Sequence, residues 1–343
     1  MLASESGPKA GHMSGNGILV TGGAGYIGSH VVRQLGEAGE RVVTLDNLSR
    51  GFKHAVTCGE LVVGDTGDGD LVRDTLRTYS IGTVMHFAAF TIVPESVAQP
   101  LKYYGNNTAS TRTLVECCLA AGIEQLVFSS TAAVYGTPPG GIADEDSPTA
   151  PINPYGTSKL MSEWMLRDVS AVTALRHVAL RYFNVAGSDP GGRIGQCTPQ
   201  ATLLTKVAVE HAVGKRSHVS IYGTDYETPD GTGIRDYIHV EDLASAHLAA
   251  LGYLRSGGCS RILNCGYGHG FSVREVLAAV ARAAGRPLDV REEPRRAGDP
   301  AKLIARAERI RSTLGWSPRY DNLDQIVGDA LRWERKLLAQ SAA

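Results

Sequence analysis

Residues 21–28 read Thr21-Gly22-Gly23-Ala24-Gly25-Tyr26-Ile27-Gly28, and this stretch decides the fold of the 343-residue chain. It follows the apolar run 18–20 and precedes a helical pattern in which Ile27, Val31 and Leu35 recur every four residues. A glycine-rich turn between a strand and a helix is typical of dinucleotide-binding βαβ units. The N–H groups that begin such a helix favour a bound pyrophosphate.

Each glycine of this turn has a separate expected role. Gly22 permits the tight turn, Gly25 lets the backbone approach a pyrophosphate, and Gly28 allows close packing of helix on strand. Asp46 ends the next apolar strand, eighteen residues after Gly28. A carboxylate there accepts hydrogen bonds from both ribose hydroxyls and repels a 2′-phosphate, so NAD is predicted rather than NADP. Arg50 lies nearby and could instead bind that phosphate.

Apolar strand patterns alternate with amphipathic helical patterns through the first half of the chain. The expected strands are 18–20, 41–45, 61–63, 84–87, 125–128 and 177–180, with helices such as 108–121 and 158–169. This alternation predicts an α/β fold with a Rossmann-type, doubly wound parallel sheet and right-handed crossovers.

The alternation breaks near residue 184, where Gly/Pro-rich loops begin to separate isolated helices near 201–213 and 273–284. These features predict a second, smaller α/β substrate lobe. The expected division is a disordered leader over 1–15, an NAD-binding domain over 16–184 to which 236–255 returns, and a substrate lobe over 185–235 and 256–335.

Composition restricts the partners of the chain. The formal net charge is −1 and only 20% of residues are charged, so no large basic surface favours nucleic acid or an anionic membrane. No apolar run approaches the roughly 18 residues of a membrane span. The six cysteines are scattered without a Cys-x-x-Cys pair, so free thiols in a reducing compartment, the cytoplasm, are expected.

A catalytic site is predicted around Tyr155 and Lys159, which lie four residues apart and therefore on one face of a helix. The ammonium group, together with the positive nicotinamide ring of NAD⁺, is expected to lower the pKa of the phenol toward neutrality. Tyr155 could then accept the proton of an alcohol being oxidised. Thr131 follows a parallel strand at its carboxyl end, where ligands bind, and is expected to hydrogen-bond the reacting oxygen.

Several histidines and acids are better explained without a metal. His239, Glu241, Asp242 and His247 superficially resemble a metal cluster, but an apolar strand leads here into acidic residues that suit a helix N-terminus. His86 ends a buried strand and is interpreted as a satisfied core histidine. No metal site is therefore predicted.

Six motifs resemble, in order and with near-family spacing, those of the UDP-glucose 4-epimerases, which are extended short-chain dehydrogenases. They are 21–30, 129–136, 153–160, 181–184, 231–240 and 295–299. The resemblance runs from residue 18 to residue 316, and its later motifs belong to a nucleotide-sugar site.

This resemblance implies roles for individual residues. Tyr155 is the acid/base, Lys159 tunes it and holds the nicotinamide ribose, and Thr131 orients the sugar hydroxyl. With the glycine turn included, the cofactor residues are Gly22, Gly25, Tyr26, Ile27, Gly28, Asp46, Asn47, Asp65, Phe87, Ala88, Ala89, Asn106, Tyr155, Lys159 and Tyr182. The residues expected to bind the UDP-sugar are Thr131, Tyr155, Asn184, Tyr222, Arg235, Arg295, Asp299 and Leu303.

The chain departs from the family pattern in places that concern substrate choice. Thr91 stands where the family often has a lysine, and Leu203 and Leu204 stand where many members have a polar residue. Val185 replaces the proline of some members. Leu303 is intermediate between the tyrosine of strict enzymes and the small residues of enzymes that accept N-acetyl sugars, so both substrate classes stay open.

The resemblance implies an isomerase of galactose metabolism that inverts C4 of UDP-glucose or UDP-galactose by transient hydride transfer to tightly bound NAD. The alternatives are a UDP-N-acetylglucosamine 4-epimerase, a nucleotide-sugar 4,6-dehydratase or decarboxylase, and a non-catalytic NAD-binding protein. Dehydratases and decarboxylases need acidic groups beside the threonine, where this chain has Ala132 and Ala133. A homodimer is also implied, with helices 109–121 and 158–169 as candidate contacts.

Overall fold

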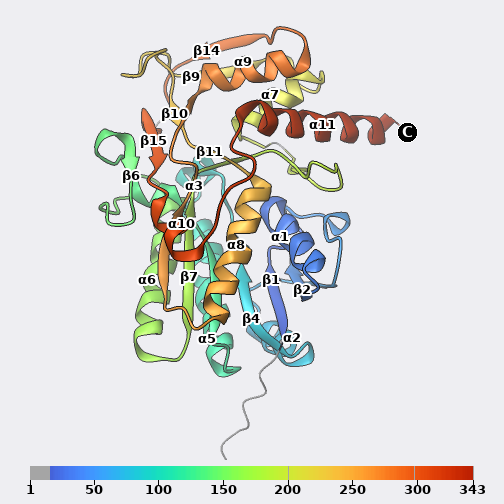
Figure 1. Ribbon diagram of the computed structural model, residues 1–343, viewed down its shortest axis with the longest axis vertical. Coiled ribbons are helices and arrows are strands. Elements are labelled where there is room, and N and C mark those ends of the chain that lie inside the picture. The colour runs from blue at the N-terminus through green and yellow to red at the C-terminus, as the bar shows by residue number, and fades with distance from the viewer. Residues whose placement is uncertain (1–15, 200, 297, 343) are drawn as a thin grey trace, which may run out of the picture.

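The computed structural model describes residues 16–199, 201–296 and 298–342, and it contains a central parallel sheet (Figure 1). The seven strands are β1 (Gly17–Thr21), β2 (Arg41–Asp46), β3 (Glu60–Val63), β4 (Ile81–His86), β5 (Gln125–Thr131), β7 (Arg176–Tyr182) and β12 (Arg261–Cys265). Their order is β12-β7-β5-β4-β1-β2-β3. The predicted doubly wound sheet is confirmed. Its order reverses between β1 and β4, which is where ligands bind in such sheets.

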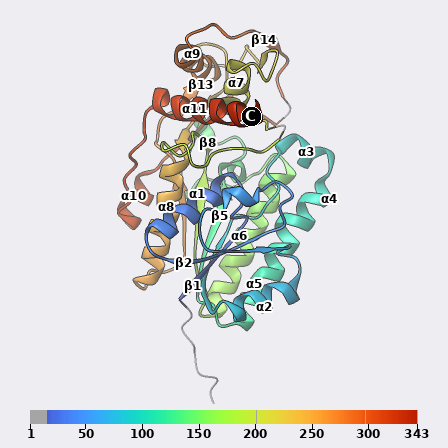
Figure 2. The ribbon, with the colours of Figure 1, turned by 90° about the vertical axis from the view of Figure 1, so that its right-hand side faces the viewer.

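Helices cover both faces of the sheet (Figures 1 and 2). On one face α1 (Tyr26–Glu37) packs against α8 (Val240–Arg255). On the other lie α2 (Gly69–Thr78), α5 (Ser110–Ala120) and α6 (Pro154–Val172). Because the strands are buried on both sides, they read as nearly continuous apolar runs in the sequence.

A smaller lobe lies above the carboxyl ends of the strands (Figures 1 and 2). Its apolar core joins α7 (Leu204–Ala212), α9 (Val273–Ala284) and α11 (Leu323–Ala342) to β9 (Val219–Tyr222), which pairs in parallel with β14 (Val290–Glu293). A second sheet has the order β13-β10-β15-β6, formed by β13 (Phe271–Ser272), β10 (Ile234–Arg235), β15 (Lys302–Ala305) and β6 (Ile142–Ala143). β6 comes from the first half of the chain and therefore ties the lobe to the cofactor domain.

Short elements complete the described chain. They are α3 (Val93–Ala98), α4 (Pro100–Tyr103), a π-helical turn (Tyr104–Ala109), 3₁₀ turns at Lys53–Ala55, Ala132–Tyr135 and Pro139–Gly141, β8 (Asn184–Ala186), β11 (Tyr237–His239) and α10 (Glu308–Leu314). Nowhere in 16–199, 201–296 or 298–342 does a helix combine the length and apolar character that crossing a membrane requires.

Several predicted boundaries need correction. β12 falls within 256–335, which was expected in the substrate lobe, but it pairs with β7 at the edge of the main sheet and buries Leu263, Asn264 and Cys265 there. The helix expected over 108–121 begins only at Ser110, because a π-helical turn precedes it. The helix expected near 201–213 begins at Leu204. The predicted leader over 1–15 lies outside the described residues.

Candidate active site

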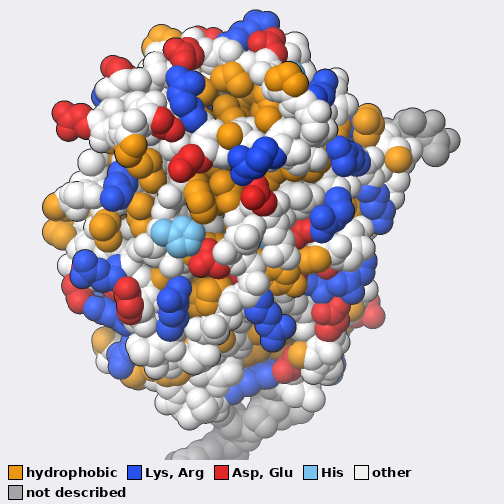
Figure 3. Space-filling view, turned by 45° about the horizontal axis from the view of Figure 1, so that its top comes forward, with side chains coloured by type: hydrophobic (Ala, Val, Ile, Leu, Met, Phe, Trp, Pro, Cys, Tyr) orange, Lys and Arg blue, Asp and Glu red, His pale blue; other side chains and the backbone are white. Residues whose placement is uncertain are grey.

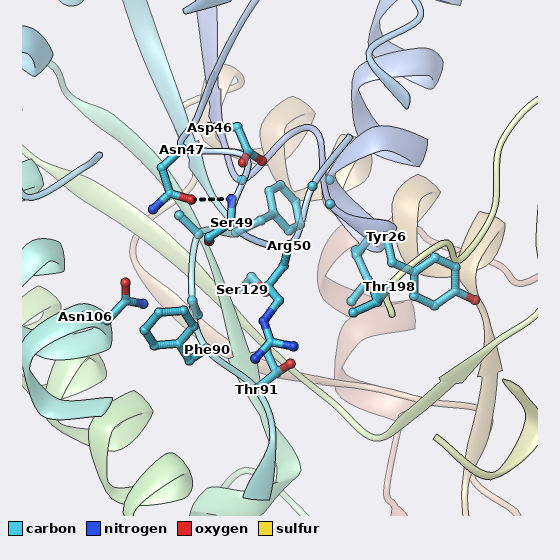
Figure 4. A pocket seen from close by; sticks show the side chains of 18 of the residues that line it. Tyr26, Asp46, Asn47, Ser49, Arg50, Phe90, Thr91, Asn106, Ser129 and Thr198 are labelled. Carbon is cyan, nitrogen blue, oxygen red and sulfur yellow. Dashed lines mark hydrogen bonds between the residues drawn. The ribbon is translucent and has the colours of Figure 1, made fainter. Parts of the chain in front are cut away.

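An open pocket lies at the carboxyl ends of the central strands, between the cofactor domain and the start of the smaller lobe (Figure 4). It gathers every predicted cofactor residue except Tyr155 and Lys159. These lining residues are Gly22, Gly25, Tyr26, Ile27, Gly28, Asp46, Asn47, Asp65, Phe87, Ala88, Ala89, Asn106 and Tyr182. Residues from six separate segments of sequence therefore meet at the place where the strand order reverses.

The glycine turn leaves no room for side chains. Gly22 has φ of +71°, and a Cβ there would lie 2.6 Å from the backbone nitrogen of Ala88. A Cβ on Gly28 would overlap the carbonyl oxygen of Gly22. Gly25 begins α1 without a side-chain cap. The first turn of α1 therefore offers N–H groups and a positive dipole end that suit a diphosphate.

Asp46 and Asp65 are fixed by backbone groups at the rim of this pocket. The Asp46 carboxylate accepts hydrogen bonds from the N–H of Ala24 at 3.0 Å and of Leu48 at 2.8 Å. Burial raises the pKa of Asp46, and these two N–H donors oppose the shift. Asp65 accepts from the N–H of Gly67 at 2.7 Å and from the Asn47 side chain at 2.8 Å. Both carboxylates are thus held in place at the pocket.

The first turn of α6 places Tyr155 beside Thr131. Asn153 caps the helix by accepting the N–H of Gly156 at 2.9 Å. A Cβ on Gly156 would lie 2.6 Å from the carbonyl oxygen of Ala133, so the helix start packs directly on the chain that follows Thr131. The Thr131 hydroxyl accepts the N–H of Ala133 and also hydrogen-bonds Tyr155. The predicted tyrosine and threonine therefore meet.

Lys159 joins this pair to the pocket wall. Its ammonium donates to the Ser129 carbonyl at 2.9 Å, and the Ser129 hydroxyl lies 2.6 Å from the phenol oxygen of Tyr182. Ser129 and Tyr182 both line the pocket. Lys159 thus stands directly behind the part of the pocket wall that Ser129 and Tyr182 form.

Burial dominates the electrostatics of Tyr155 and Lys159. Burial raises the pKa of Tyr155, and only the Thr131 hydrogen bond opposes this shift. Burial also lowers the pKa of Lys159 to about 7, against the attraction of Glu163. In the protein without cofactor, Lys159 therefore does not lower the phenol pKa, because both groups are desolvated. The lowering expected from Lys159 together with the nicotinamide ring stays a prediction.

The histidines and acids that the sequence analysis explained without a metal have hydrogen-bond or ion-pair partners in the structure. His86 lies 2.6 Å from the Thr21 hydroxyl and 2.8 Å from the Thr111 hydroxyl, and burial lowers its pKa to about 3, so it is a satisfied core histidine as predicted. His239 faces Asp329 at 3.1 Å, and Glu241 bonds His30. The described residues hold no group of three or more His, Cys, Asp or Glu suited to a metal.

The predicted UDP residues meet on the smaller lobe. Arg235 on β10 donates to the Asp299 carboxylate at 2.8 Å. Arg295 donates to Asp225 at 2.7 Å and lies 4.2 Å over the ring of Tyr226, whose hydroxyl reaches the Asp299 carbonyl. Asp299, Arg295 and Asp225 are exposed, whereas Arg235 is partly buried. Charges of both signs are mixed over the face in Figure 3. Guanidinium groups held this way can exchange a carboxylate for a phosphate.

The remaining substrate residues connect this patch to the catalytic turn. Leu303 pairs with Arg235 in the parallel register of β15 and β10. The backbone N–H of Asn184 donates to the carbonyl of Asp236, next to Arg235. Gly298 lies close to Ile152, three residues before Tyr155. Tyr222 stands at the edge of the lobe under the guanidinium of Arg296, at 3.6 Å.

Three residues at these sites were not predicted from the sequence. Ser129 begins the Ser-Ser-Thr run, of which only Thr131 is predicted as a site residue. Arg296 directly follows the predicted Arg295. Tyr226 is the ring on which Arg295 lies. Neighbouring polar positions in the same motifs could have identified the first two, whereas the Tyr226 contact joins segments 69 residues apart and left no local signal.

The geometry defines a class of protein: an enzyme that binds a dinucleotide and moves hydride to and from an alcohol carbon. The chain belongs to the NAD-dependent epimerase/dehydratase family, whose model matches residues 18–266.

Proteins of similar sequence and structure match nearly the whole chain. The UDP-glucose 4-epimerase of Azospirillum brasilense is 56% identical over 93% of this chain and 92% of its own. The crystal structure of UDP-glucose 4-epimerase from Bifidobacterium longum in complex with NAD⁺ and UDP has a TM-score of 0.89 at 38% identity, covering 93% and 98%. The UDP-Glc/GlcNAc 4-epimerase of Campylobacter jejuni has a TM-score of 0.82 at 49% identity, covering 94% and 100%.

Proposed function

We propose that this chain is an NAD-dependent isomerase that inverts C4 of UDP-glucose and UDP-galactose. The observation that carries the proposal is the meeting of Thr131, Tyr155 and Lys159 behind the wall of the dinucleotide pocket. Ala132 and Ala133 follow the threonine, so the site lacks the neighbouring acids that a dehydratase or decarboxylase needs. Relatives at 56% and 47% identity over most of the chain are UDP-glucose 4-epimerases.

NAD fits the pocket as the cofactor, and its chemistry when bound is reversible acceptance of hydride from the sugar carbon. The chain's residues handle the proton. Tyr155 takes the proton of the 4-hydroxyl through its phenol oxygen and later returns it. Thr131 orients that hydroxyl, and Lys159 in its protonated form contributes positive charge on the same helix face as Tyr155. Asp46 holds the adenosine ribose and disfavours a 2′-phosphate.

The UDP portion of the substrate is assigned to the exposed patch of the smaller lobe. Arg235 and Arg295 supply paired donors for the diphosphate, and Asp299 can hold ribose hydroxyls. Asn184 and Tyr222 complete the assigned contacts. Anchoring at UDP alone lets the oxidised hexose turn over and receive hydride on its other face, which is what inversion requires.

The side chain at position 303 supports a second substrate, UDP-N-acetylglucosamine. Leu303 is smaller than tyrosine and pairs with Arg235 in the sheet that bears the UDP patch. The UDP-Glc/GlcNAc 4-epimerase of Campylobacter jejuni shares 49% of its residues with this chain. We propose that N-acetylated UDP-sugars are accepted more slowly than the simple hexoses.

We further propose a homodimer formed through an apolar surface on the α5/α6 side of the sheet. Val97, Leu101, Met161 and Trp164 are exposed there, on α3, α4 and α6, and these three helices pack together. Exposed apolar clusters of this kind mark protein interfaces. The six cysteines are free thiols, which supports the reducing cytoplasm as the compartment. We place the reaction in galactose metabolism.

The direct test is to incubate the purified protein separately with UDP-galactose and with UDP-N-acetylgalactosamine and to resolve the sugar products. Conversion to UDP-glucose without net NADH supports the proposal. Net accumulation of NADH would identify a dehydrogenase instead, and no conversion of either sugar would leave only a non-catalytic NAD-binding protein.

A further inference from the structure

The catalytic face of α6 carries a third ionisable residue that the proposed reaction leaves unused. Tyr155, Lys159 and Glu163 follow one another at intervals of four residues, so all three lie on the same face of the helix. All three side chains are buried. A carboxylate one helical turn from a buried ammonium group is near enough to attract it, and Glu163 does favour the charged form of Lys159.

Glu163 is held from two neighbouring strands. Arg181 on β7 donates through Nε to one carboxylate oxygen at 3.0 Å and through Nη2 to the other at 2.6 Å. The Ser130 hydroxyl on β5 also donates to this carboxylate. The guanidinium of Arg181 in turn lies 4.8 Å from the ring centre of Tyr135. These donors hold the carboxylate in one place.

The same carboxylate acts on the strand end that bears the catalytic threonine. Ser130, which donates to Glu163, stands between two residues of the site. On one side is Ser129, whose carbonyl accepts from the Lys159 ammonium at 2.9 Å. On the other side is Thr131, whose hydroxyl meets the catalytic tyrosine. Glu163 therefore bonds the middle residue of a tripeptide whose outer residues contact the lysine and the tyrosine.

Glu163 is the anion among the ionisable groups that surround Lys159 in the described chain. Four other groups around this pair carry no charge near neutral pH in the protein without cofactor. They are His86, whose pKa burial lowers to about 3, and Tyr135, Tyr155 and Tyr182, whose pKa values burial raises. The remaining group is Arg181, which is positive and paired with Glu163. Without the carboxylate, the buried ammonium would have a second cation nearby and no opposing charge.

We propose that Glu163 is a positioning residue of the catalytic site, whose carboxylate keeps the Lys159 ammonium charged and holds the strand end that bears Thr131. The inference rests on the proposed function, in which Tyr155 moves the proton with the help of Lys159. Glu163 acts on the reaction through Lys159 and Ser130 and carries no proton itself.

The consequence concerns the protonation of the lysine near neutral pH. The pKa of Lys159 is already as low as about 7 with the attraction of Glu163 in place. If that attraction is removed, the lysine loses its proton at a lower pH. Tyr155 then has no ammonium group beside it to favour the phenolate, and its phenol is a poorer proton acceptor.

The test compares Glu163→Gln, Arg181→Met and the double variant that carries both changes, each with its cofactor bound. Each single variant breaks the same buried ion pair, so a merely structural role predicts the same outcome for both. The double variant leaves no unpaired charge in the core, so it is expected to fold even where Glu163→Gln does not.

The first measurement is the titration of Lys159 itself. It is followed by NMR through the Cε signals of isotope-labelled lysine, and the Lys159 signal is assigned by its loss in Lys159→Met. In Glu163→Gln and in the double variant, the pH at which Lys159 gives up its proton should fall by about one unit or more. Arg181→Met keeps the carboxylate, so its Lys159 should titrate no lower than that of wild type.

The second measurement is kcat with UDP-galactose from pH 6 to 9. At low pH Lys159 keeps much of its charge in every variant, whereas at high pH the variants without the carboxylate lose it first. The ratio of wild-type kcat to that of the double variant should therefore rise about five- to tenfold over this range for a one-unit shift. The ratio should not rise for Arg181→Met. Glu241→Gln removes another buried carboxylate, paired with Arg33 on the opposite side of the sheet, and should give a constant ratio.

Three results would overturn the assignment. They are titration of Lys159 at the wild-type pH in the double variant, an equal lowering in Arg181→Met and Glu163→Gln, and a kcat ratio that stays constant with pH in the double variant.

Because the titration does not depend on turnover, the two proposals can fail separately. If the titration moves as expected but wild type converts no UDP-galactose, Glu163 still keeps Lys159 charged and the proposed function is wrong. If wild type converts the sugar and the titration does not move, the proposed function stands and the role of Glu163 is wrong.

Discussion

The cofactor side and the substrate side of the cleft are held together by different kinds of contact. On the cofactor side, backbone N–H groups fix Asp46, and close backbone packing fixes the turn at Gly28. On the substrate side, ion pairs join the partly buried Arg235 to Asp299 and the exposed Arg295 to Asp225.

This difference matches the chemistry proposed for the two ligands. Backbone contacts are set once by folding and form a rigid cradle suited to a cofactor that stays bound. Exposed ion pairs are weak, and their arginines can exchange one anion for another at small cost. A substrate held only through such arginines can enter, turn over and leave. Substitutions should therefore act on one side at a time.

The largest effect is expected where the two sides meet. Tyr155→Phe removes the proton acceptor and should lower kcat about 10²- to 10⁴-fold. NAD should stay bound, because the phenol hydroxyl lies behind the pocket wall. Steady-state rates with UDP-galactose and bound NAD per chain measure both. The control Tyr253→Phe lies on α8, away from the pocket, and should be neutral; normal turnover by Tyr155→Phe would refute the acid/base role.

Gly28→Ala disturbs the cofactor side where the backbone packs most closely, against Gly22. The added methyl overlaps the carbonyl oxygen of Gly22, so the turn must open, at a cost of about 1–3 kcal/mol, and NAD retention should fall sharply. Gly252→Ala, in the middle of α8 with open space around it, is the matched control and should gain up to about 1 kcal/mol. Thermal unfolding and NAD content distinguish the two. Full NAD retention by Gly28→Ala would show that the cradle is not rigid.

Burial of Lys159 should make the cofactor side sensitive to pH. Its pKa falls from 10.5 to about 7 on folding, so between these values the unfolded chain binds a proton that the folded chain does not. Stability without cofactor should therefore rise with pH from 7 to 9, by up to about 1.4 kcal/mol per pH unit, relative to Lys159→Met. Urea unfolding at pH 7, 8 and 9 measures this slope. Lys53→Met, at an exposed position, should follow wild type; parallel curves for Lys159→Met would contradict the burial effect.

Arg295→Ala tests the substrate side. Loss of one exposed guanidinium should raise KM for UDP-galactose about tenfold, with NAD content unchanged. Arg274→Ala removes another exposed ion pair of the same lobe, with Glu292, and serves as control. A drop in bound NAD in Arg295→Ala would mean that the two sides are not separate.

Local patterns made much of this predictable. The helix expected over 273–284 has those bounds in the structure, because Ser272 and Glu275 form a capping box and Gly285 ends the helix with φ of +71°. The pairing of Tyr155 with Lys159 followed from helix spacing, and the glycine turn from its place between strand and helix.

Contacts between distant segments could not be predicted. The approach of Arg50 to Glu95 joins the loop after β2 to helix α3, 45 residues further along the chain, and β12 joins the main sheet only through its pairing with β7. The pKa of Tyr155 depends on how deeply the folded chain buries it, which spacing does not encode.

The most direct test of a fixed cofactor and a turning sugar follows one hydrogen. UDP-galactose carrying deuterium at C4 is converted in ordinary water, and the UDP-glucose product is examined by mass spectrometry and NMR. The account predicts that deuterium stays at C4, because the hydride given to bound NAD returns to the same carbon. Product with ordinary hydrogen at C4 and label in the water would contradict it.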